Sequence, residues 1–285
     1  MVLPTRRSTT AVVLGACLLI VVGAATAQAA LTAAQNTSTL GFLRAFTTSI
    51  PALADVWVGT EWCTWPYIDC NSDTNITLTI DNAGLTGSLP DQPASVNGAL
   101  VALTEISITN MNITGGFKDS WGGLRTVRVL NFTNTPLFGT IPLSWNAISA
   151  LQIIALRNSS ACGSLPSYTL RSLRVIDVSD NVLRGPLPAT WGNIGGLQSV
   201  SLVGNWFCGC NPQSWVSRVL STALFQAMGY APFDTTCRPP INCATAEGGV
   251  CSRSPPRYTN GAAAPLCVAL AAVTLLLSVV TTLFL

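Results

Sequence analysis

The stretch that decides the fold is LRVIDVSDNVLRGPLP, at residues 173–188. Its apolar residues follow the order L-x-x-L-x-L, and an asparagine, a leucine, a glycine and the pair Leu-Pro come next. Alternating apolar residues predict a short strand with one buried face. The glycine permits a sharp backbone turn, and the final proline begins a segment in which a missing N–H costs little.

The same frame, L-x-x-L-x-L-x-x-N-x-L-x-G-x-L-P, occurs six times in varying completeness. Successive frames start 28, 24, 24, 22 and 24 residues apart, counted from Leu78, Ile106, Leu130, Ile154, Ile176 and Val200. Periods of about 20–29 residues with this pattern are typical of leucine-rich repeats, whose coils stack because none can close its own core. We therefore predict a leucine-rich-repeat solenoid over residues 75–207, with short parallel β-strands on the concave side, an irregular convex side and disulfide-stapled caps that contain helices.

Two positions of each repeat are expected to lie in the interior of the solenoid. Trp145 and Trp191 follow the Pro of the frame by three residues, and Trp121 holds the same phase. We expect these indoles to fill the core, in preference to serving as ligand platforms. At the asparagine position only two repeats carry Asn. There we expect a side chain that bonds the backbone of adjacent turns, a role that Thr135 and Ser159 can fill in part.

Residues 28–74 are predicted to form the N-terminal cap, because stacked coils leave an open apolar face at each end. Helical spacing is seen ahead of Pro51, at Leu40, Leu43, Phe46 and Ile50. An aromatic cluster and a close cysteine pair follow. We predict a disulfide Cys63–Cys70, which closes a short loop and contributes about 2–4 kcal/mol.

Residues 208–251 are predicted to form a Cys-rich C-terminal cap. Asn211 and Pro212 suit the start of a helix, an apolar stripe runs from Trp215 to Met228, and Gly229 ends it. Eight cysteines lie outside the terminal segments, and an even set in an exported chain indicates disulfides. Zinc is the less favoured alternative because the spacings do not suit it. Our predicted pairs are Cys208–Cys237 and Cys210–Cys243, which leave Cys162 and Cys251 unassigned.

Residues 1–27 are typical of a secretory signal peptide. Arg6 and Arg7 provide the positive start, residues 11–22 are uncharged and apolar, and small residues suit cleavage. The alternative is a membrane anchor, but this stretch is shorter than the roughly 20 residues that span a bilayer.

The other end is typical of glycolipid anchoring. Small residues at Asn260 and Gly261 precede an apolar tail without charges. We expect residues 252–260 to form a short linker, residues 261–285 to be removed, and the anchor to attach at Asn260, with Gly261 as the alternative. A retained tail helix is the second interpretation, although such helices usually carry flanking Lys or Arg.

Composition fits an exported glycoprotein. Charged residues make up 9% of the chain, against about 25% in ordinary soluble domains. Solubility can come from N-linked glycans at the five N-x-S/T sites, Asn36, Asn75, Asn112, Asn131 and Asn158. The net charge is +2, and the sequence has no basic patch that would indicate a nucleic-acid partner. Nothing in the sequence indicates a cofactor or a metal.

Catalysis is disfavoured by residue type. The chain has no His, which removes Ser-His-Asp and Cys-His nucleophile systems. Paired carboxylates remain, but the frame puts no two acids in register on neighbouring strands. Asp177 lies diagonal to Arg157, which we expect to neutralise it. The outward residues that we predict to orient a partner are Asp81, Glu105, Ser107, Thr109, Thr133, Arg157, Asp177 and Ser179. A bland solvated sheet is the alternative.

The cap resembles that of trypanosomatid promastigote surface antigens, in the motifs Leu40-Gly41-Phe42-Leu43-Arg44-Ala45-Phe46, Ile50-Pro51-Ala52-Leu53, Trp57-x-Gly59 and Trp62-Cys63-x-Trp65. The G-x-L-P-x-x-W repeats and the Cys-rich end are similar too, so the resemblance covers residues 38–260 and both terminal signals. It implies a leucine-rich-repeat coat protein with a glycolipid anchor that contacts host receptors or resists host defences. The chain departs from the family in lacking a long Thr/Pro-rich stalk, so its ectodomain should sit close to the membrane.

These features together predict a cell-surface recognition or adhesion protein on the extracellular face of the plasma membrane. Its expected partners are proteins or glycans of a host or neighbouring cell, and it touches the membrane through its lipid anchor. Two alternatives stay open. One is a passive coat or immune decoy, and the other is a co-receptor with a retained C-terminal membrane helix. An enzyme is not expected.

Overall fold

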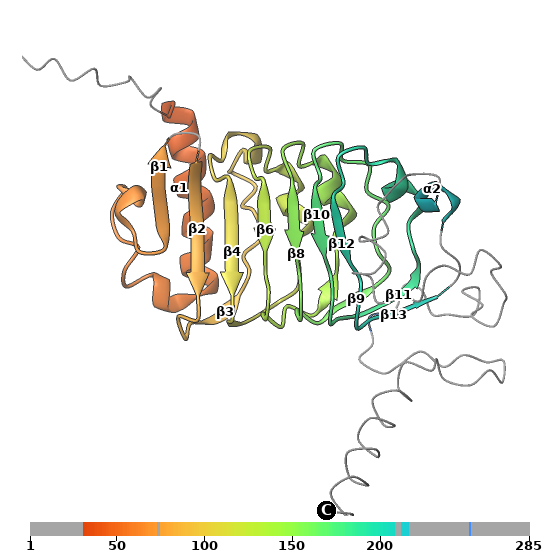
Figure 1. Cartoon of the computed structure of the whole chain (residues 1–285). Helices are drawn as coiled ribbons and strands as arrows, with labels where there is room; N and C mark the ends of the chain where they lie inside the picture. Colours follow the sequence, from red (N-terminus) through yellow and green to blue (C-terminus); the bar gives the residue numbers. More distant parts are fainter. Residues whose placement is uncertain (1–30, 73–74, 209–211, 217–250, 252–285) are drawn as a thin grey trace, which may run out of the picture. The chain divides into compact units, whose positions relative to one another are not determined.

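The computed structural model of the protein describes residues 31–72, 75–208, 212–216 and 251. Its main element is a seven-stranded sheet whose strands stand side by side in chain order (Figure 1). The strands are β1 (Ile68–Ser72), β2 (Asn75–Asp81), β4 (Glu105–Thr109), β6 (Val129–Asn131), β8 (Ile153–Ala155), β10 (Val175–Asp177) and β12 (Ser199–Ser201). Strand β1 is antiparallel to β2, and the later neighbours are all parallel. Each predicted repeat therefore supplies one strand, and the N-terminal cap supplies the seventh.

The register of the parallel strands follows the repeat frame. One buried row crosses the sheet, with no member more than 1% exposed: Leu78, Ile106, Leu130, Ile154, Ile176 and Val200. Because side chains alternate along a strand, the residues on either side of this row lie on the outward face of the sheet, where most of them are half-buried. The predicted fold class is confirmed by this ladder.

The other side of each coil is less regular. Short strands pair there in the orders β13-β11-β9-β7 and β3-β5. Their bounds are β3 (Thr86–Ser88), β5 (Asn112–Thr114), β7 (Gly139–Thr140), β9 (Ala161–Gly163), β11 (Val182–Pro186) and β13 (Trp206–Cys208). The 3-10 helices are η3 (Gly98–Leu100), η4 (Asp119–Gly123), η5 (Leu143–Ala147) and η6 (Ala189–Asn193). The apolar core lies between these elements and the seven-stranded sheet.

The frame glycine acts through two different constraints. Gly185 has φ +84°, in the left-handed region that favours glycine. Gly139 has no such φ, but a Cβ there would lie 3.3 Å from the Cα of Gly116 in the preceding coil. Close stacking of neighbouring coils therefore selects glycine where the backbone angle does not.

The asparagine position bonds neighbouring coils as expected. Asn181 is buried, and its amide donates to three carbonyls, those of Leu156, Val178 and Ser179, at 2.7–3.0 Å. Its Oδ1 accepts from the N–H groups of Ser159 and Ala161. In earlier coils Thr135 and Ser159 each donate one hydroxyl to a carbonyl of the preceding coil, at 2.9 and 2.8 Å. Their partial substitution for asparagine is thus confirmed.

Aromatic side chains link the coils on the convex side. Trp121, Trp145 and Trp191 are at most 1% exposed, which confirms that they fill the core. Each indole N–H donates to a carbonyl of the preceding coil, at Pro90, Lys118 and Pro166, over 2.9–3.0 Å. Tyr168 fills the same role in the fourth repeat, which the sequence frame does not reveal because it follows its proline by two residues.

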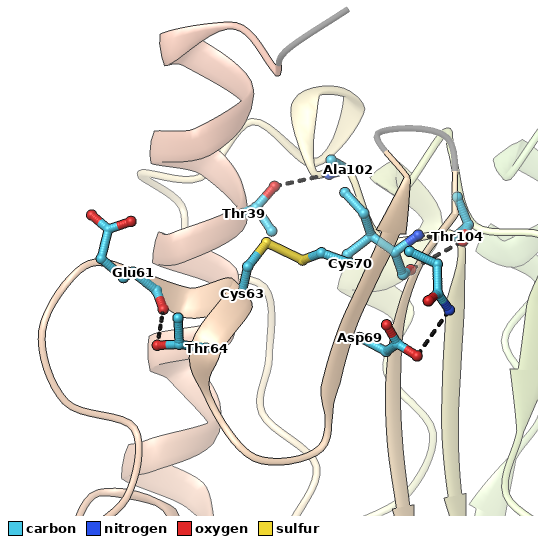
Figure 2. The surroundings of a disulfide bond; sticks show 10 residues. Thr39, Glu61, Cys63, Thr64, Asp69, Cys70, Ala102 and Thr104 are labelled. Atoms are coloured by element: carbon cyan, nitrogen blue, oxygen red, sulfur yellow. Dashed lines mark hydrogen bonds between the residues drawn. A yellow bond between two sulfur atoms is a disulfide. The ribbon is translucent and has the colours of Figure 1, made fainter. Parts of the chain in front are cut away.

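The N-terminal cap covers the first coil. Helix α1 (Ala33–Ser49) buries Phe42, Leu43 and Phe46, and two short turns, η1 (Pro51–Leu53) and η2 (Trp62–Thr64), follow. Thr39 accepts a hydrogen bond from the N–H of Ala102 at 2.9 Å, which ties α1 to the second coil. Figure 2 shows the disulfide Cys63–Cys70 joining η2 to strand β1 beside this helix. The cysteine pair that the sequence predicts is therefore present.

At the other end, Trp215 lies on the short helix α2 (Gln213–Val216). Its indole donates to the carbonyl of Pro188 at 2.9 Å and stacks on Trp191, so it belongs to the sixth repeat as Trp191 belongs to the fifth. The sequence placed it on an apolar stripe of the cap helix, and that stripe beyond residue 216 lies outside the described residues. So do the pairings Cys208–Cys237 and Cys210–Cys243, both terminal signals and Asn260.

A second disulfide joins Cys162 on β9 to Cys251, 89 residues further along the chain. The sequence left these two cysteines unassigned. The bond ties the end of the predicted C-terminal cap to the fourth coil. Within the described ranges, no helix has the length and apolarity that a bilayer span needs.

Candidate recognition surface

The outward face of the seven-stranded sheet, here called the concave face, carries three rows of side chains that cross the strands. Neighbouring strands pair without register shifts from β2 to β12, so equivalent residues of each repeat lie beside one another. The eight predicted partner-orienting residues all fall on this face. Their exposure to solvent differs between residues on the strands and residues in the turns that follow.

The first row is apolar at its centre. It contains Thr77, Glu105, Val129, Ile153, Val175 and Ser199 in register. The three aliphatic members are half-buried and follow one another on β6, β8 and β10. Glu105 is the charged group at the edge of this strip. Nothing else in the row carries charge, so contacts here are largely van der Waals in character.

The second row contains two separate groups of hydrogen-bonded side chains. Its members in register are Thr79, Ser107, Asn131, Ala155, Asp177 and Ser201. Asn131 donates through Nδ2 to the hydroxyl of Ser107 at 3.1 Å, and its Oδ1 accepts from the N–H and hydroxyl of Thr133. In the fifth coil, Asp177 accepts from the N–H and hydroxyl of Ser179 at 3.0 and 2.6 Å. Ser107 and Ser179 are only 5% and 6% exposed, so little of either side chain is open to a partner, and each is hydrogen-bonded to a neighbour.

The third row lies at the carboxyl ends of the strands, beside a rim of amide side chains. Its members are Asp81, Thr109, Thr133, Arg157 and Ser179. Asp81 accepts from the hydroxyl of Thr109 at 2.6 Å and from the amide of Asn110 at 2.7 Å. Asn134 donates to Asn110, and Asn158 donates to Asn134, at 2.8 and 3.1 Å. The hydrogen bonds from Thr109 and then Asn110 hold the pKa of the Asp81 carboxyl below its ordinary value. This rim is exposed and stays ionised at Asp81 near neutral pH.

The rim depends on a left-handed backbone residue after each strand. Asn110, Asn134, Asn158 and Asp180 have φ between +52° and +56°. Asn and Asp tolerate this region better than other L-residues. The repeat frame does not include this position, although the recurrence of Asn and Asp there is a sequence signal that identifies it.

The expected neutralisation of Asp177 by Arg157 is wrong. Arg157 donates through Nε to Asp180 at 3.0 Å, one coil further along the rim. Asp177 lies in the second row, where Ser179 bonds it, while Arg157 lies in the third row beside the turn that carries Asp180. Both partners of this ion pair are exposed, so its contribution to stability is small.

Strand β1, which precedes the predicted repeats, adds a polar strip to the sheet. Asp69 pairs in register with Thr77, beside the first row, and its carboxylate accepts from the amide of Asn71 at 2.8 Å. Tyr67, with φ +71°, stands 37% exposed just before this strand. The N-terminal cap therefore extends the concave face by one strand.

The five predicted glycan sites differ in exposure. Asn131 is half-buried in the second row of the concave face, while the other four are exposed: Asn36, Asn75, Asn112 and Asn158. Asn36 lies on α1 and Asn75 starts β2, whereas Asn112 starts β5 on the other side of the coil. Only Asn131 would put a glycan in the middle of the face.

The face presents aliphatic, hydroxyl and amide groups together with separated charged groups. Within the described residues, no two acids face each other in register on neighbouring strands of the concave sheet. No cluster of potential metal ligands occurs in the same part of the chain. An apolar centre flanked by hydroxyls, amides and separated charges can make directional contacts with a ligand while excluding water from the centre.

The stacked coils, the parallel sheet and the disulfide-bonded cap define a leucine-rich-repeat protein. Over 102 residues the chain is 33% identical to the surface membrane glycoprotein GP46/M-2 of Leishmania amazonensis, and the match covers 35% of this chain and 21% of that relative. The aligned part is thus about a fifth of the relative's length. No family model matches the chain.

Two solved structures share the fold. The PEPR1–AtPEP1 complex matches 63% of this chain and 26% of its own, with 22% identity and a TM-score of 0.54. A plant ice-binding protein matches 65% of this chain and 60% of its own, with 23% identity and a TM-score of 0.54. At these identities the likeness concerns the architecture, which the ladder of parallel strands independently displays.

Proposed function

We propose that this protein is a cell-surface recognition protein of the promastigote surface antigen type, exported and held on the outer face of the plasma membrane by a glycolipid anchor at Asn260. Its similarity to a Leishmania surface membrane glycoprotein supports the location. We further propose that it binds host or neighbouring-cell proteins or glycans and has no catalytic role. The binding proposal rests on one observation: the concave face combines a half-buried aliphatic centre with hydroxyl, amide and charged groups around it.

The accessible groups of that face suit a partner with both apolar and polar surface. Val129, Ile153 and Val175 form the half-buried centre, and Asp81 and Glu105 lie toward one end. Burial of the aliphatic centre contributes a favourable hydrophobic free energy that is partly offset by the entropy cost of association, and the charged groups fix orientation. Ser107 and Ser179 hold Asn131 and Asp177 in place.

A pair of matched variants of the full chain, displayed on cells, tests the binding site. Ile153→Arg puts a long charged side chain at the centre of the concave face. Leu143→Arg makes the same change at a residue that is 59% exposed on η5, away from the sheet. Binding of the cells to a panel of immobilised glycans and extracellular proteins is measured. We expect Ile153→Arg to abolish partner binding and Leu143→Arg to leave it intact.

Other outcomes would assign the protein a different function or a different binding site. If no panel member binds the unchanged protein, a passive coat or decoy is the better description. If both variants lose binding equally, the concave face is not the site. Treatment of intact cells with phosphatidylinositol-specific phospholipase C tests the anchor separately. Release supports it, and retention favours a co-receptor with a membrane helix.

A further inference from the structure

Four arginines precede strands β6 and β10, at matching positions of two coils that are separated by the coil of β8. They form the motif R-x-x-R twice, as Arg125-Thr126-Val127-Arg128 and Arg171-Ser172-Leu173-Arg174, at the same phase of the third and fifth repeats. We propose that this arginine edge, defined by Arg125, Arg128, Arg171 and Arg174, binds a sulfated polysaccharide. The site is distinct from the concave face and does not depend on its use.

The backbone fixes the spacing of the edge. The N–H of Gln152 donates to the carbonyl of Arg128, and the N–H of Arg174 donates to the carbonyl of Gln152, both at 2.8 Å. Neighbouring parallel strands lie about 4.8 Å apart, so Arg128 and Arg174 are about 10 Å apart along the edge. Figure 1 shows β6, β8 and β10 side by side, with their amino ends along one edge of the sheet.

The row extends beyond the arginines with neutral donors. The N–H of Gln198 donates to the carbonyl of Arg174, also at 2.8 Å, which continues the row into the sixth coil. Both Gln152 and Gln198 are exposed, and Arg128 is exposed as well. Successive coils therefore present guanidinium and amide N–H groups to solvent along a line that crosses the strands.

These charges have no acidic partner within the described part of the chain. The two ion pairs found there are Lys118–Asp91 and Arg157–Asp180. The side chains of Arg125 and Arg174 donate to backbone carbonyls, those of Ala147, Arg171 and Leu173. Such bonds orient a guanidinium without neutralising it. Half of the eight described Lys and Arg residues are thus gathered, uncompensated, on one edge.

The residue type favours sulfate groups on a chain. Guanidinium presents a planar fork of N–H donors that fits a tetrahedral oxyanion through two parallel hydrogen bonds, and it is weakly hydrated. Two such clusters separated by a neutral coil match a polymer with repeated anionic groups better than a single small anion. Like charges held close together also repel, and a polyanion relieves that repulsion.

A lipid surface fits less well. Membrane-binding basic surfaces combine cations with exposed apolar side chains that enter the interface. Within the described residues the exposed large apolar side chains are Val56, Val58, Tyr67, Phe138, Leu143 and Val203, and none belongs to this edge. The edge is therefore polar throughout, as a glycan site would be.

The test uses the full chain, purified in detergent, on immobilised heparin at about 0.15 M ionic strength, where distant charges are screened. The double variant R128A/R171A removes two edge charges. The matched control R44A/K118A also removes two positive charges, at positions outside both the edge and the concave face. We expect R128A/R171A to weaken binding about tenfold, and the control to change it less than about twofold.

Further arms separate the sources of the anion. Heparin stripped of its sulfate groups should not compete, and vesicles of phosphatidylserine should not compete either. The proposal is overturned if the unchanged chain does not bind heparin, if both double variants lose binding equally, or if desulfated heparin competes as well as heparin. Competition by the vesicles would assign the edge to a membrane instead. Urea denaturation of both variants checks that each remains folded.

Discussion

The phenol of Tyr168 donates its hydrogen bond to the carbonyl of Pro142, at 2.8 Å, and its ring stacks on Trp191. The indoles of the neighbouring coils bond the preceding coil in the same way. A phenol reaches the same kind of acceptor from one position earlier in its coil. An aromatic side chain therefore bonds each of these coils to the preceding one, although the fourth repeat has a tyrosine where its neighbours have tryptophan.

Loss of that single hydroxyl should be measurable. Tyr168→Phe keeps the aromatic ring that stacks on Trp191 but removes the hydrogen bond to the carbonyl of Pro142. We expect the free energy of unfolding to fall by about 1 kcal/mol, the usual net value of a buried hydrogen bond. Urea denaturation near neutral pH measures the change. An unchanged midpoint would show that the bond contributes nothing.

The same phenol should make the protein sensitive to alkali. Burial, and then the charge of Asp119, raises the pKa of Tyr168 well above its ordinary value. At pH above about 10 the unfolded chain releases this proton and the folded chain retains it, so stability is lost as pH rises. We expect Tyr168→Phe to lose less stability than the unchanged protein between about pH 8 and about pH 11. Equal losses in denaturation curves would contradict this assignment.

Asn181 should matter far more than the threonine that replaces it two coils earlier. Its side chain makes five hydrogen bonds to buried backbone groups, whereas the Thr135 hydroxyl makes two. Asn181→Ala leaves several groups unsatisfied and should cost about 3 kcal/mol or more, against about 1 kcal/mol for the shape-conserving Thr135→Val. Thermal and urea unfolding of the two variants give the comparison. Similar losses would mean that water replaces the missing amide.

The two disulfides should differ in their contribution. Cys63–Cys70 spans 7 residues and Cys162–Cys251 spans 89. In the chain-entropy model these loops correspond to about 2 and about 5 kcal/mol. Replacing both cysteines of each pair with serine, in separate variants, should therefore destabilise the protein more for the longer loop. The reverse order in urea denaturation would show that the segment between Cys162 and Cys251 is restrained without the bond.

Glycan occupancy tests the proposed use of the concave face. Asn131 is half-buried and holds three hydrogen bonds, so a sugar there would disrupt the second row and cover the face. Glycopeptide mass spectrometry should find Asn131 unmodified. Asn112→Gln, at an exposed site, serves as the positive control and should remove one glycan from the total mass. A glycan on Asn131 would move any partner site to the caps or the convex side.

The residues that lie on the concave face could be predicted in large part, whereas the hydrogen bonds among them could not. Strand alternation alone assigned Asp81, Glu105 and Asp177 to the outward side, because the buried row fixes the register. The repeat frame predicted the backbone hydrogen bonds of the inward asparagine position, but it gave no information on the partners of the outward side chains. Ser107 and Ser179 proved to be buried supports, and Arg157 bonds Asp180. These partners depend on side-chain rotamers and on the turn after each strand.

By itself the sequence determined which residues point inward and how often the coil repeats, since burial of apolar side chains at a fixed period leaves one arrangement of the strands. Only the tertiary structure decided which side chains meet across coils, such as the bond between Cys162 and Cys251 and the ion pair of Arg157 with Asp180. The physical reason is distance. Residues 22 to 89 positions apart come into contact through the stacking offset of whole coils, which no local pattern of residues encodes.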